Sequence, residues 1–157
     1  MNYYIYENYL GKFYILEMDG FITGLSTDEK DIPSDSKEYL SEPIKDCIAE
    51  LEMYFKGELK RFTVPIVYNG TKFQESVWNA LLNIPYGETR SYQEVAEEVG
   101  SEKAVRAVGG ANNKNPLMIL IPCHRVIGKD GSLVGFGGGL ELKSELLNLE
   151  SLNKGEK

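Results

Sequence analysis

The chain has 157 residues, of which 42% are apolar, so it is long enough for one domain or two small ones with a real core. Its formal net charge of −7 argues against a protein that binds polyanions through charge alone. It has no run of about 18 apolar residues, and no basic segment followed by an apolar one at the N-terminus. We therefore expect a cytoplasmic protein without a membrane helix, and its two cysteines argue against a disulfide framework.

Charge is unevenly divided along the chain. Residues 1–70 hold 7 basic and 13 acidic residues, a balance of −6, whereas residues 71–157 hold 10 and 11, a balance of −1. This difference suggests that the two parts have different roles. Binding of nucleic acid by the second part stays open, with a modest and salt-sensitive affinity.

The first part begins with the pattern of an antiparallel sheet. Tyr, Phe and Ile alternate with polar residues over 3–27, and Gly11-Lys12 and Asp19-Gly20 separate the runs. An Asp-Gly pair between such runs is typical of a hairpin, so we predict two or three antiparallel strands. The polar residues 28–36 predict a loop.

A helix and a further strand are predicted next. Apolar residues at helical spacing predict a helix over 44–55, and Pro43 suits its first turn. Cys47 lies on the apolar stripe of this helix, which favours a place in the core over a chemical role. Residues 62–67 predict another strand, so the first part is a small α/β domain without a motif for chemistry.

A turn sequence at 68–70 suggests a boundary between domains 1–70 and 71–157. Thr71 and Gln74 fit a capping box, and the apolar residues that follow share one face of a helix. The second domain therefore begins with an amphipathic helix.

Two short helices joined by Gly-Ser come next. Ser91 and Glu94 form another capping box, and Gly100 stands where a helix-ending glycine belongs. We expect Ser101 to cap a third helix over 103–112. This pattern is typical of a helix-turn-helix, although an ordinary helical hairpin has the same pattern.

The third predicted helix consists almost entirely of small residues. Its Gly109-Gly110 pair costs about 1–2 kcal/mol of helix propensity. A face of this kind suits close approach to another backbone, either of protein or of nucleic acid. Arg106 is the long cation on it, and a solvated surface charge is the alternative role.

A possible reactive centre follows at Cys123-His124. The apolar run 119–121 predicts a short buried strand, which Pro122 ends because it has no N–H to donate. The next two residues are a cysteine and the only histidine in the chain. A reactive thiol and an inert buried cysteine are equally compatible with this position.

The C-terminal part combines a glycine-rich loop with a helix. Residues 135–139 lack the spacing and the Lys-Ser/Thr pair of a phosphate-binding loop. A last helix is predicted from Leu140 to Leu152, and Glu150 lies on it.

These motifs resemble those of the O6-alkylguanine-DNA alkyltransferases, also called methylated-DNA–protein-cysteine methyltransferases. The resemblance rests on Pro122-Cys123-His124-Arg125-Val126-Ile127, on Arg106-Ala107-Val108-Gly109-Gly110-Ala111, on Asn115-Pro116 and on Gly138-Gly139. It runs without a gap from about residue 73 to residue 150.

The resemblance implies a fold and an activity. The fold is α/β plus α: a small N-terminal α/β domain like ribonuclease H, and a mostly helical C-terminal domain with a helix-turn-helix of winged type. The activity is DNA repair, in which the protein flips an alkylated guanine out of double-stranded DNA from the minor groove. It then moves the alkyl group from O6 to its own cysteine, irreversibly and once per molecule, and activity on O4-alkylthymine is left open.

The resemblance also implies roles for single residues. Cys123 is the acceptor, His124 the base, and Glu150 the acid that orients the imidazole. Asn115 braces the turn that carries the cysteine, and Tyr92 donates to the departing base. The remaining residues with implied roles are Lys143, which assists the thiolate or the base; Arg106, which fills the vacated place in the stack; Ala104, Ala107, Gly109, Gly110 and Arg125, which contact DNA; and Asn112, Val126, Phe136, Gly137 and Gly138, which line the substrate pocket.

Chemical reasoning supports several of these roles. Displacement at an alkyl carbon needs a thiolate, and a His–Glu pair supplies the base that forms one. Guanine leaves poorly as an anion, so a nearby donor helps, and a stacked base must be flipped to be reached. We expect no cofactor, no metal and a monomer.

Two other functions stay open. The first is a lesion-binding protein that flips bases without reacting, and the second is a Cys-His hydrolase unrelated to DNA. The presence of Cys123 disfavours the first, since relatives of that kind lack the acceptor. A multiple-turnover reaction without nucleic-acid affinity would support the second.

Overall fold

The computed structural model describes residues 1–133 and 139–154. The chain divides into two compact units, Met1–Tyr68 and Asn69–Lys157, and we describe each by itself. None of the helices among the described residues is long and apolar enough to cross a membrane.

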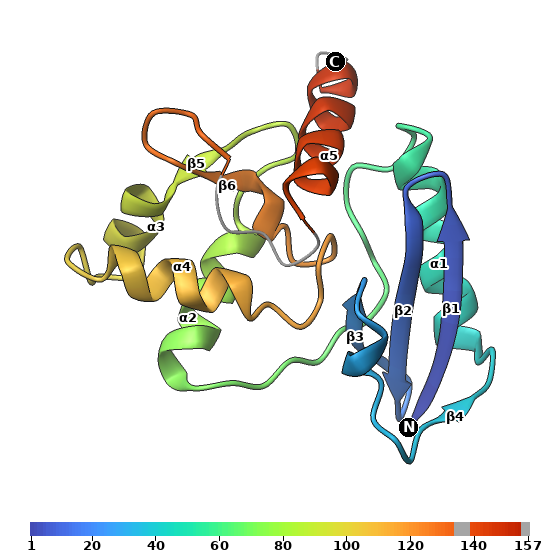
Figure 1. Cartoon of the computed structure of the whole chain (residues 1–157). Helices are drawn as coiled ribbons and strands as arrows, with labels where there is room; N and C mark the ends of the chain where they lie inside the picture. Colours follow the sequence, from blue (N-terminus) through green and yellow to red (C-terminus); the bar gives the residue numbers. More distant parts are fainter. Residues whose placement is uncertain (134–138, 155–157) are drawn as a thin grey trace. The chain divides into compact units, whose positions relative to one another are not determined.

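The first unit is a four-stranded sheet with one α-helix against a face of it (Figure 1). Its elements are the strands β1 (Asn2–Asn8), β2 (Gly11–Met18), β3 (Phe21–Ser26) and β4 (Lys37–Glu38), the 3-10 helix η1 (Glu29–Asp31), and the helix α1 (Glu42–Phe55). The strand order is β3-β2-β1-β4, with antiparallel hairpins between β1, β2 and β3 and a parallel β4. The predicted antiparallel strands are confirmed, and β4 and η1 lie at or just beyond the predicted loop.

The core of this unit lies between the sheet and α1. Phe13 and Ile15 alternate with more exposed residues along β2, while Ile44 and Leu51 face them from α1, and all four are fully buried. Cys47 lies in the same layer, and burial raises the pKa of its thiol to about 12. The predicted helix and the place of Cys47 in the core are therefore confirmed.

The strand predicted over 62–67 is wrong. The segment makes one isolated bridge, in which Ile22 donates to the carbonyl of Pro65 and Val67 donates to the carbonyl of Ile22. Before that bridge, the Glu50 carboxylate of α1 accepts hydrogen bonds from Thr63 and from the Val64 backbone. Pairing with a side chain takes the place of a ladder there, and Pro65 has no N–H to continue one.

The second unit consists of helices with a two-stranded parallel sheet. Its elements are α2 (Lys72–Leu82), β5 (Arg90–Ser91), α3 (Tyr92–Glu98), α4 (Val105–Asn113), the 3-10 helix η2 (Cys123–Arg125), β6 (Val126–Ile127) and α5 (Leu140–Asn153). The predicted capping boxes at Thr71–Gln74 and Ser91–Glu94 are both present, with reciprocal hydrogen bonds. Local sequence therefore sets where α2 and α3 begin.

Helix α4 starts differently from the prediction. It begins at Val105 after Ala104, and no side chain caps it. Ser101 forms a turn instead, in which its carbonyl accepts from the Ala104 N–H at 2.7 Å. The prediction that Ser101 caps this helix is therefore wrong, because the turn takes up the residues of the predicted first turn.

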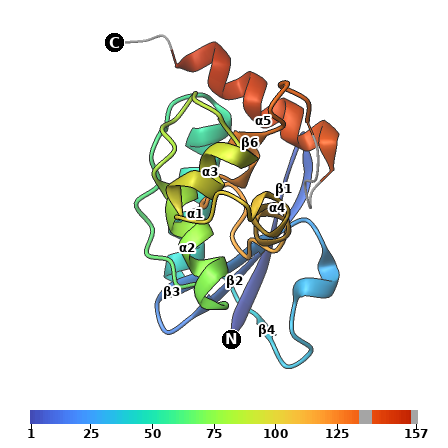
Figure 2. The ribbon, with the colours of Figure 1, turned by 90° about the vertical axis from the view of Figure 1, so that its left-hand side faces the viewer.

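Helices α2 and α3 both pack against α4 and leave another side of it open. Figure 2 shows α4 nearly end-on, with α2 and α3 on the same side of it. The Trp78 indole on α2 donates to the carbonyl of Ala111 on α4 at 2.9 Å. Val108 and Ala111 face this core, while Arg106 and Gly110 are exposed. The helix-turn-helix pair α3–α4 is thus fixed from one side.

The strand predicted over 119–121 is also wrong. The segment is a buried tight turn, in which Leu120 donates to the Met118 carbonyl and Ile121 to the Leu117 carbonyl, both at 2.8 Å. Ile119 has a φ of 72°, which is rare for a β-branched residue and costs about 1–3 kcal/mol. The run is apolar because the turn is buried, and it places Cys123 at the start of η2.

Candidate active site

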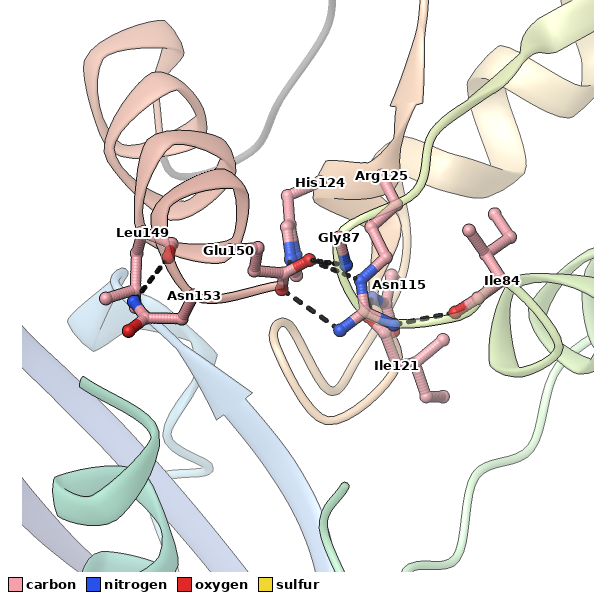
Figure 3. A network of polar contacts seen from close by, with 9 residues as sticks. All are labelled: Ile84, Gly87, Asn115, Ile121, His124, Arg125, Leu149, Glu150 and Asn153. Atoms are coloured by element: carbon pink, nitrogen blue, oxygen red, sulfur yellow. Dashed lines mark hydrogen bonds and ion pairs between the residues drawn. The ribbon is translucent and has the colours of Figure 1, made fainter. Parts of the chain in front are cut away.

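A side-chain brace holds the turn that carries Cys123. Asn115, which Figure 3 shows next to Ile121, donates from Nδ2 to the Ile121 carbonyl at 2.8 Å. Its Oδ1 accepts from the Leu117 N–H at 2.9 Å. The Cys123 N–H donates to the same Ile121 carbonyl at 2.7 Å. The amide of Asn115 therefore fixes both ends of the strained turn before the thiol.

Replacing Asn115 by alanine is expected to destabilise the protein by about 2–5 kcal/mol, because it leaves a buried carbonyl and a backbone N–H with fewer partners. Urea denaturation measures this change. Asn148→Ala, at an exposed position of α5, is the control and should change stability by less than about 0.5 kcal/mol. Equal stabilities of the two variants would contradict the role of Asn115 as a brace.

His124, the residue after Cys123, forms a buried pair with Glu150. The Nε2 atom of His124 lies 2.6 Å from Oε2 of Glu150, and neither side chain is more than 1% exposed. Glu150 reaches the pair from α5, which follows η2 after the glycine-rich segment. Its Oε1 also accepts from the Gly87 N–H at 3.1 Å (Figure 3).

The charges of this pair follow from its surroundings. Burial by itself raises the pKa of Glu150, but hydrogen bonds and charges from His124 and Arg125 outweigh it and hold that pKa well below its usual range. Burial lowers the pKa of His124, although Glu150 opposes this. An ionised Glu150 accepts from Nε2, so a neutral His124 carries its proton there, and Nδ1 is the nitrogen able to take another.

Cys123 is protonated at rest. Burial raises the pKa of its thiol to about 11, although the Asn115 side chain and the charge of Lys143 act in the opposite direction. Lys143 is itself fully buried on α5, and this burial lowers the pKa of its ammonium group. A base is therefore needed to make the thiolate, and a positive charge stands ready to stabilise it.

Tyr92 and Asn112 lie around the same cysteine. The Nζ atom of Lys143 lies 5.9 Å from the centre of the Tyr92 ring. Burial raises the pKa of Tyr92, negative charge on Cys123 raises it further, and the Asn112 side chain lowers it. Asn112 also donates from Nδ2 to the Cys123 carbonyl at 3.3 Å. Polar side chains from α3, α4 and α5 thus lie around Cys123.

The DNA contact predicted for Arg125 stays a prediction, and the structure gives this residue partners inside the protein. Its side chain is only 9% exposed, and its guanidinium binds both oxygens of Glu150 and the Ile84 carbonyl. Three of the five N–H donors of this guanidinium are bound inside the protein, and the side chain has little exposed surface to offer a phosphate. Arg125, Ile84 and Gly87 belong to the site, and no sequence motif pointed to the last two.

The remaining predicted residues fall into three groups. Arg106, Ala107 and Gly110 are exposed on α4, and Ala104 and Gly109 are half-buried there. Val126 is fully buried in β6. The predicted pocket residues Phe136, Gly137 and Gly138 lie outside the described residues. Within the described ranges, no group of three His, Cys, Asp or Glu side chains lies close enough to hold a metal ion.

The fold and the site together define a class of protein: a helix-turn-helix domain that also contains a buried thiol and a buried imidazole–carboxylate pair. Comparison with known proteins narrows this class. Residues 72–152 match the model of the "6-O-methylguanine DNA methyltransferase, DNA binding domain", and residues 1–68 match that of the corresponding "ribonuclease-like domain".

Relatives match two thirds of the chain or its whole length. The constitutive methylated-DNA–protein-cysteine methyltransferase of Bacillus subtilis is 45% identical, with all of both chains covered. The enzyme of that name from Methanosarcina acetivorans is 57% identical over 68% of each chain. A crystal structure of Mycobacterium tuberculosis OGT in complex with DNA has a TM-score of 0.91 and 40% identity, covering 98% of this chain and 94% of that one.

The chain belongs to the 6-O-methylguanine DNA methyltransferase family. The resemblance seen in the sequence motifs is thereby confirmed, and so is the predicted fold of a ribonuclease-like α/β domain followed by a helical DNA-binding domain.

Proposed function

We propose that this protein repairs double-stranded DNA by moving the alkyl group of O6-alkylguanine irreversibly to Cys123, once per molecule. The observation that carries the proposal is the buried constellation of Cys123, His124 and Glu150. Family membership supports the same reaction. A thiol with a pKa of about 11 stays protonated until a base acts on it, which limits reaction with other electrophiles.

The transfer is a displacement at carbon. The Cys123 S–H proton passes to Nδ1 of His124, and Glu150 stabilises the imidazolium that forms. The sulfur then forms a bond to the alkyl carbon while the bond from that carbon to guanine O6 breaks. Guanine leaves as an anion and takes up one proton, so the reaction consumes no proton overall. The alkyl group stays bound to the Cys123 sulfur as a stable thioether, so the free thiol is not regenerated.

Two further side chains assist the departing base. Tyr92 presents a half-buried hydroxyl near Cys123, and its O–H donates to the base as negative charge develops. Lys143 stabilises the thiolate through its charge before transfer. Both act on charge that exists only during the reaction, which is where stabilisation raises the rate.

Flipping of the base relies on the exposed face of α4. Arg106 and Gly110 lie on that face, four residues apart and therefore on one side of the helix. Small residues let the backbone approach a narrow minor groove, and Arg106 fills the space that the flipped base leaves. These contacts are independent of base sequence, as a search for damage requires.

A mass measurement tests the function. Incubation with duplex DNA that contains one O6-methylguanine should add one methyl group to the peptide with Cys123, and restore guanine in the DNA. Folded protein that binds this duplex but leaves both masses unchanged would indicate a lesion-binding protein instead. Release of many product molecules per protein would indicate a hydrolase.

Substitutions at Gly110 allow effects on stability to be distinguished from effects on DNA binding. A Cβ atom at this position meets nothing within 4 Å, so Gly110→Ala should stabilise the protein by about 0.5–1 kcal/mol through helix propensity. Gly110→Gln should fold as well but bind duplex DNA at least about 10-fold more weakly, because a long side chain holds the helix away from the groove. Fluorescence anisotropy with labelled duplex measures this, and Ser151→Gln on α5 is the control. Equal affinity of Gly110→Gln and the control would contradict the use of this face.

A further inference from the structure

Arg125 joins three parts of the second unit at the carboxylate of Glu150. Its Nε donates to Oε1 of Glu150 at 2.8 Å, and its Nη2 donates to Oε2 at 3.0 Å, a two-pronged contact (Figure 3). Its Nη1 donates to the Ile84 carbonyl at 2.7 Å, and its Cζ lies 5.6 Å from the centre of the Tyr86 ring. The guanidinium is thereby fixed from α5 and from the turn that follows α2.

The carboxylate of Glu150 accepts hydrogen bonds on both of its oxygens from groups inside the protein. His124 and Arg125 contact Oε2, while Arg125 and the Gly87 N–H contact Oε1. The guanidinium is permanently charged, so it cancels the negative charge of Glu150 at any pH of interest. The hydrogen bond to His124 is kept, but the attraction of the carboxylate for a second proton on the imidazole is weakened.

The other charged or titratable groups around His124 either disfavour its protonation, as Arg125 does, or are neutral. The charge of Lys143 on α5 lowers the pKa of His124, as burial and the charge of Arg125 do, and the Cys123 thiol next to His124 in η2 is neutral at rest. Tyr86, in the turn after α2, faces Glu150 and Arg125 and is neutral as well. Glu150 therefore favours an imidazolium, whereas burial and the charges of Arg125 and Lys143 oppose it.

We propose that Arg125 is a positioning residue for the proposed reaction: its guanidinium fixes and neutralises Glu150, so that His124 begins as a neutral imidazole and can accept the Cys123 proton. Without this neutralisation, His124 takes a proton from solvent first. It then has no place for the proton of the thiol. This inference rests on the proposed function, but its central statement concerns the charge of His124 and can be measured without DNA.

The wild-type protein provides the first test. His124 is the only histidine in the chain, so the imidazole signals of the full-length protein in NMR need no assignment. The expected result is a titration midpoint below the ordinary value of 6.5, despite a carboxylate at 2.6 Å. An imidazolium that persists at pH 7.5 would overturn the proposal, whatever the behaviour of any variant.

Two variants then separate charge from geometry. Arg125→Gln removes the charge, and we expect the His124 midpoint to rise by about 1–3 pH units. Arg125→Lys keeps the charge without the two-pronged contact, so the midpoint should stay within about half a pH unit of wild type while methyl transfer slows. Arg61→Gln removes an exposed positive charge from the first unit and should leave the titration unchanged.

The rate of methyl transfer links this titration to the reaction. The acidic limb of the rate–pH profile should move upward in Arg125→Gln by the same amount as the NMR midpoint, and should stay in place in Arg125→Lys. A purely structural Arg125 would lower stability and rate in both variants without moving either midpoint, and that result would overturn the proposal. Absence of methyl transfer by wild type would reject the proposed function but leave the NMR comparison valid.

Discussion

Cys123→Ser is expected to bind duplex DNA with O6-methylguanine as tightly as wild type, and to leave the lesion unrepaired. The exchange of sulfur for oxygen keeps the size of a side chain that is 4% exposed, so the fold should persist. A serine hydroxyl is a far weaker nucleophile at carbon, and His124 is too weak a base to ionise it fully. We expect the rate to fall by roughly 10³-fold or more. Intact-protein mass spectrometry and a binding assay on the same sample measure both quantities.

Cys47→Ala is the matched control for this variant. Cys47 is the other free cysteine, and it is fully buried in the core of the first unit. Its replacement should lower stability modestly but leave the methyl mass shift in place. Retention of the mass shift in Cys123→Ser, or its loss in folded Cys47→Ala, would mean that the acceptor has been wrongly assigned.

Glu150→Gln is expected to have the second large effect, on both stability and rate. The amide keeps the shape of the side chain, but Arg125 becomes a buried charge without a counterion. Breaking a buried pair in this way costs about 3–5 kcal/mol. His124 also loses the anion that orients it and stabilises its protonated form, so methyl transfer should slow by about 10²–10⁴-fold. Denaturation in urea and single-turnover kinetics measure the two effects.

The pH dependence of stability adds a second measurement for this variant. Glu150 has a lowered pKa in the folded protein, so its contribution to stability is complete above the ordinary value of 4.5 and is lost as the pH falls below it. Glu150→Gln should therefore lose less stability than wild type between about pH 5 and pH 2. Glu145→Gln, at an exposed position of the same helix, should follow wild type. Identical acid profiles for Glu150→Gln and wild type would contradict the ionised pair.

The parts of the fold that the sequence predicted well are those set by neighbouring residues. Thr71 and Gln74 cap the N-terminus of α2 through contacts three residues apart, and Ser91 and Glu94 do the same for α3. Alternation of apolar residues located the first three strands for the same reason. Such signals depend on a few consecutive residues, so one sequence contains all the information they need.

The errors concern segments whose conformation depends on distant partners. An apolar run at 119–121 is equally compatible with a buried strand and a buried turn, and the Asn115 amide decides between them. The segment 62–67 becomes irregular because Glu50 of α1 supplies acceptors there. Periodicity carries no information about either partner.

Arg125 illustrates the same limit within the site. Next to His124 in a chain expected to bind DNA, an arginine suggests a phosphate contact. Its actual partners are 25 and 41 residues away in sequence. The motif predicted which residues cluster around the thiol, while the direction of each side chain followed only from the three-dimensional packing.

The contact between α2 and α4 has a practical consequence. Trp78 is the only tryptophan in the chain, and its indole N–H is bonded to the carbonyl of Ala111, on the helix proposed to enter the minor groove. Tryptophan emission from this protein therefore comes from one known position beside that helix. It provides an intrinsic optical signal with which docking on DNA can be followed in real time, separately from the chemistry at sulfur.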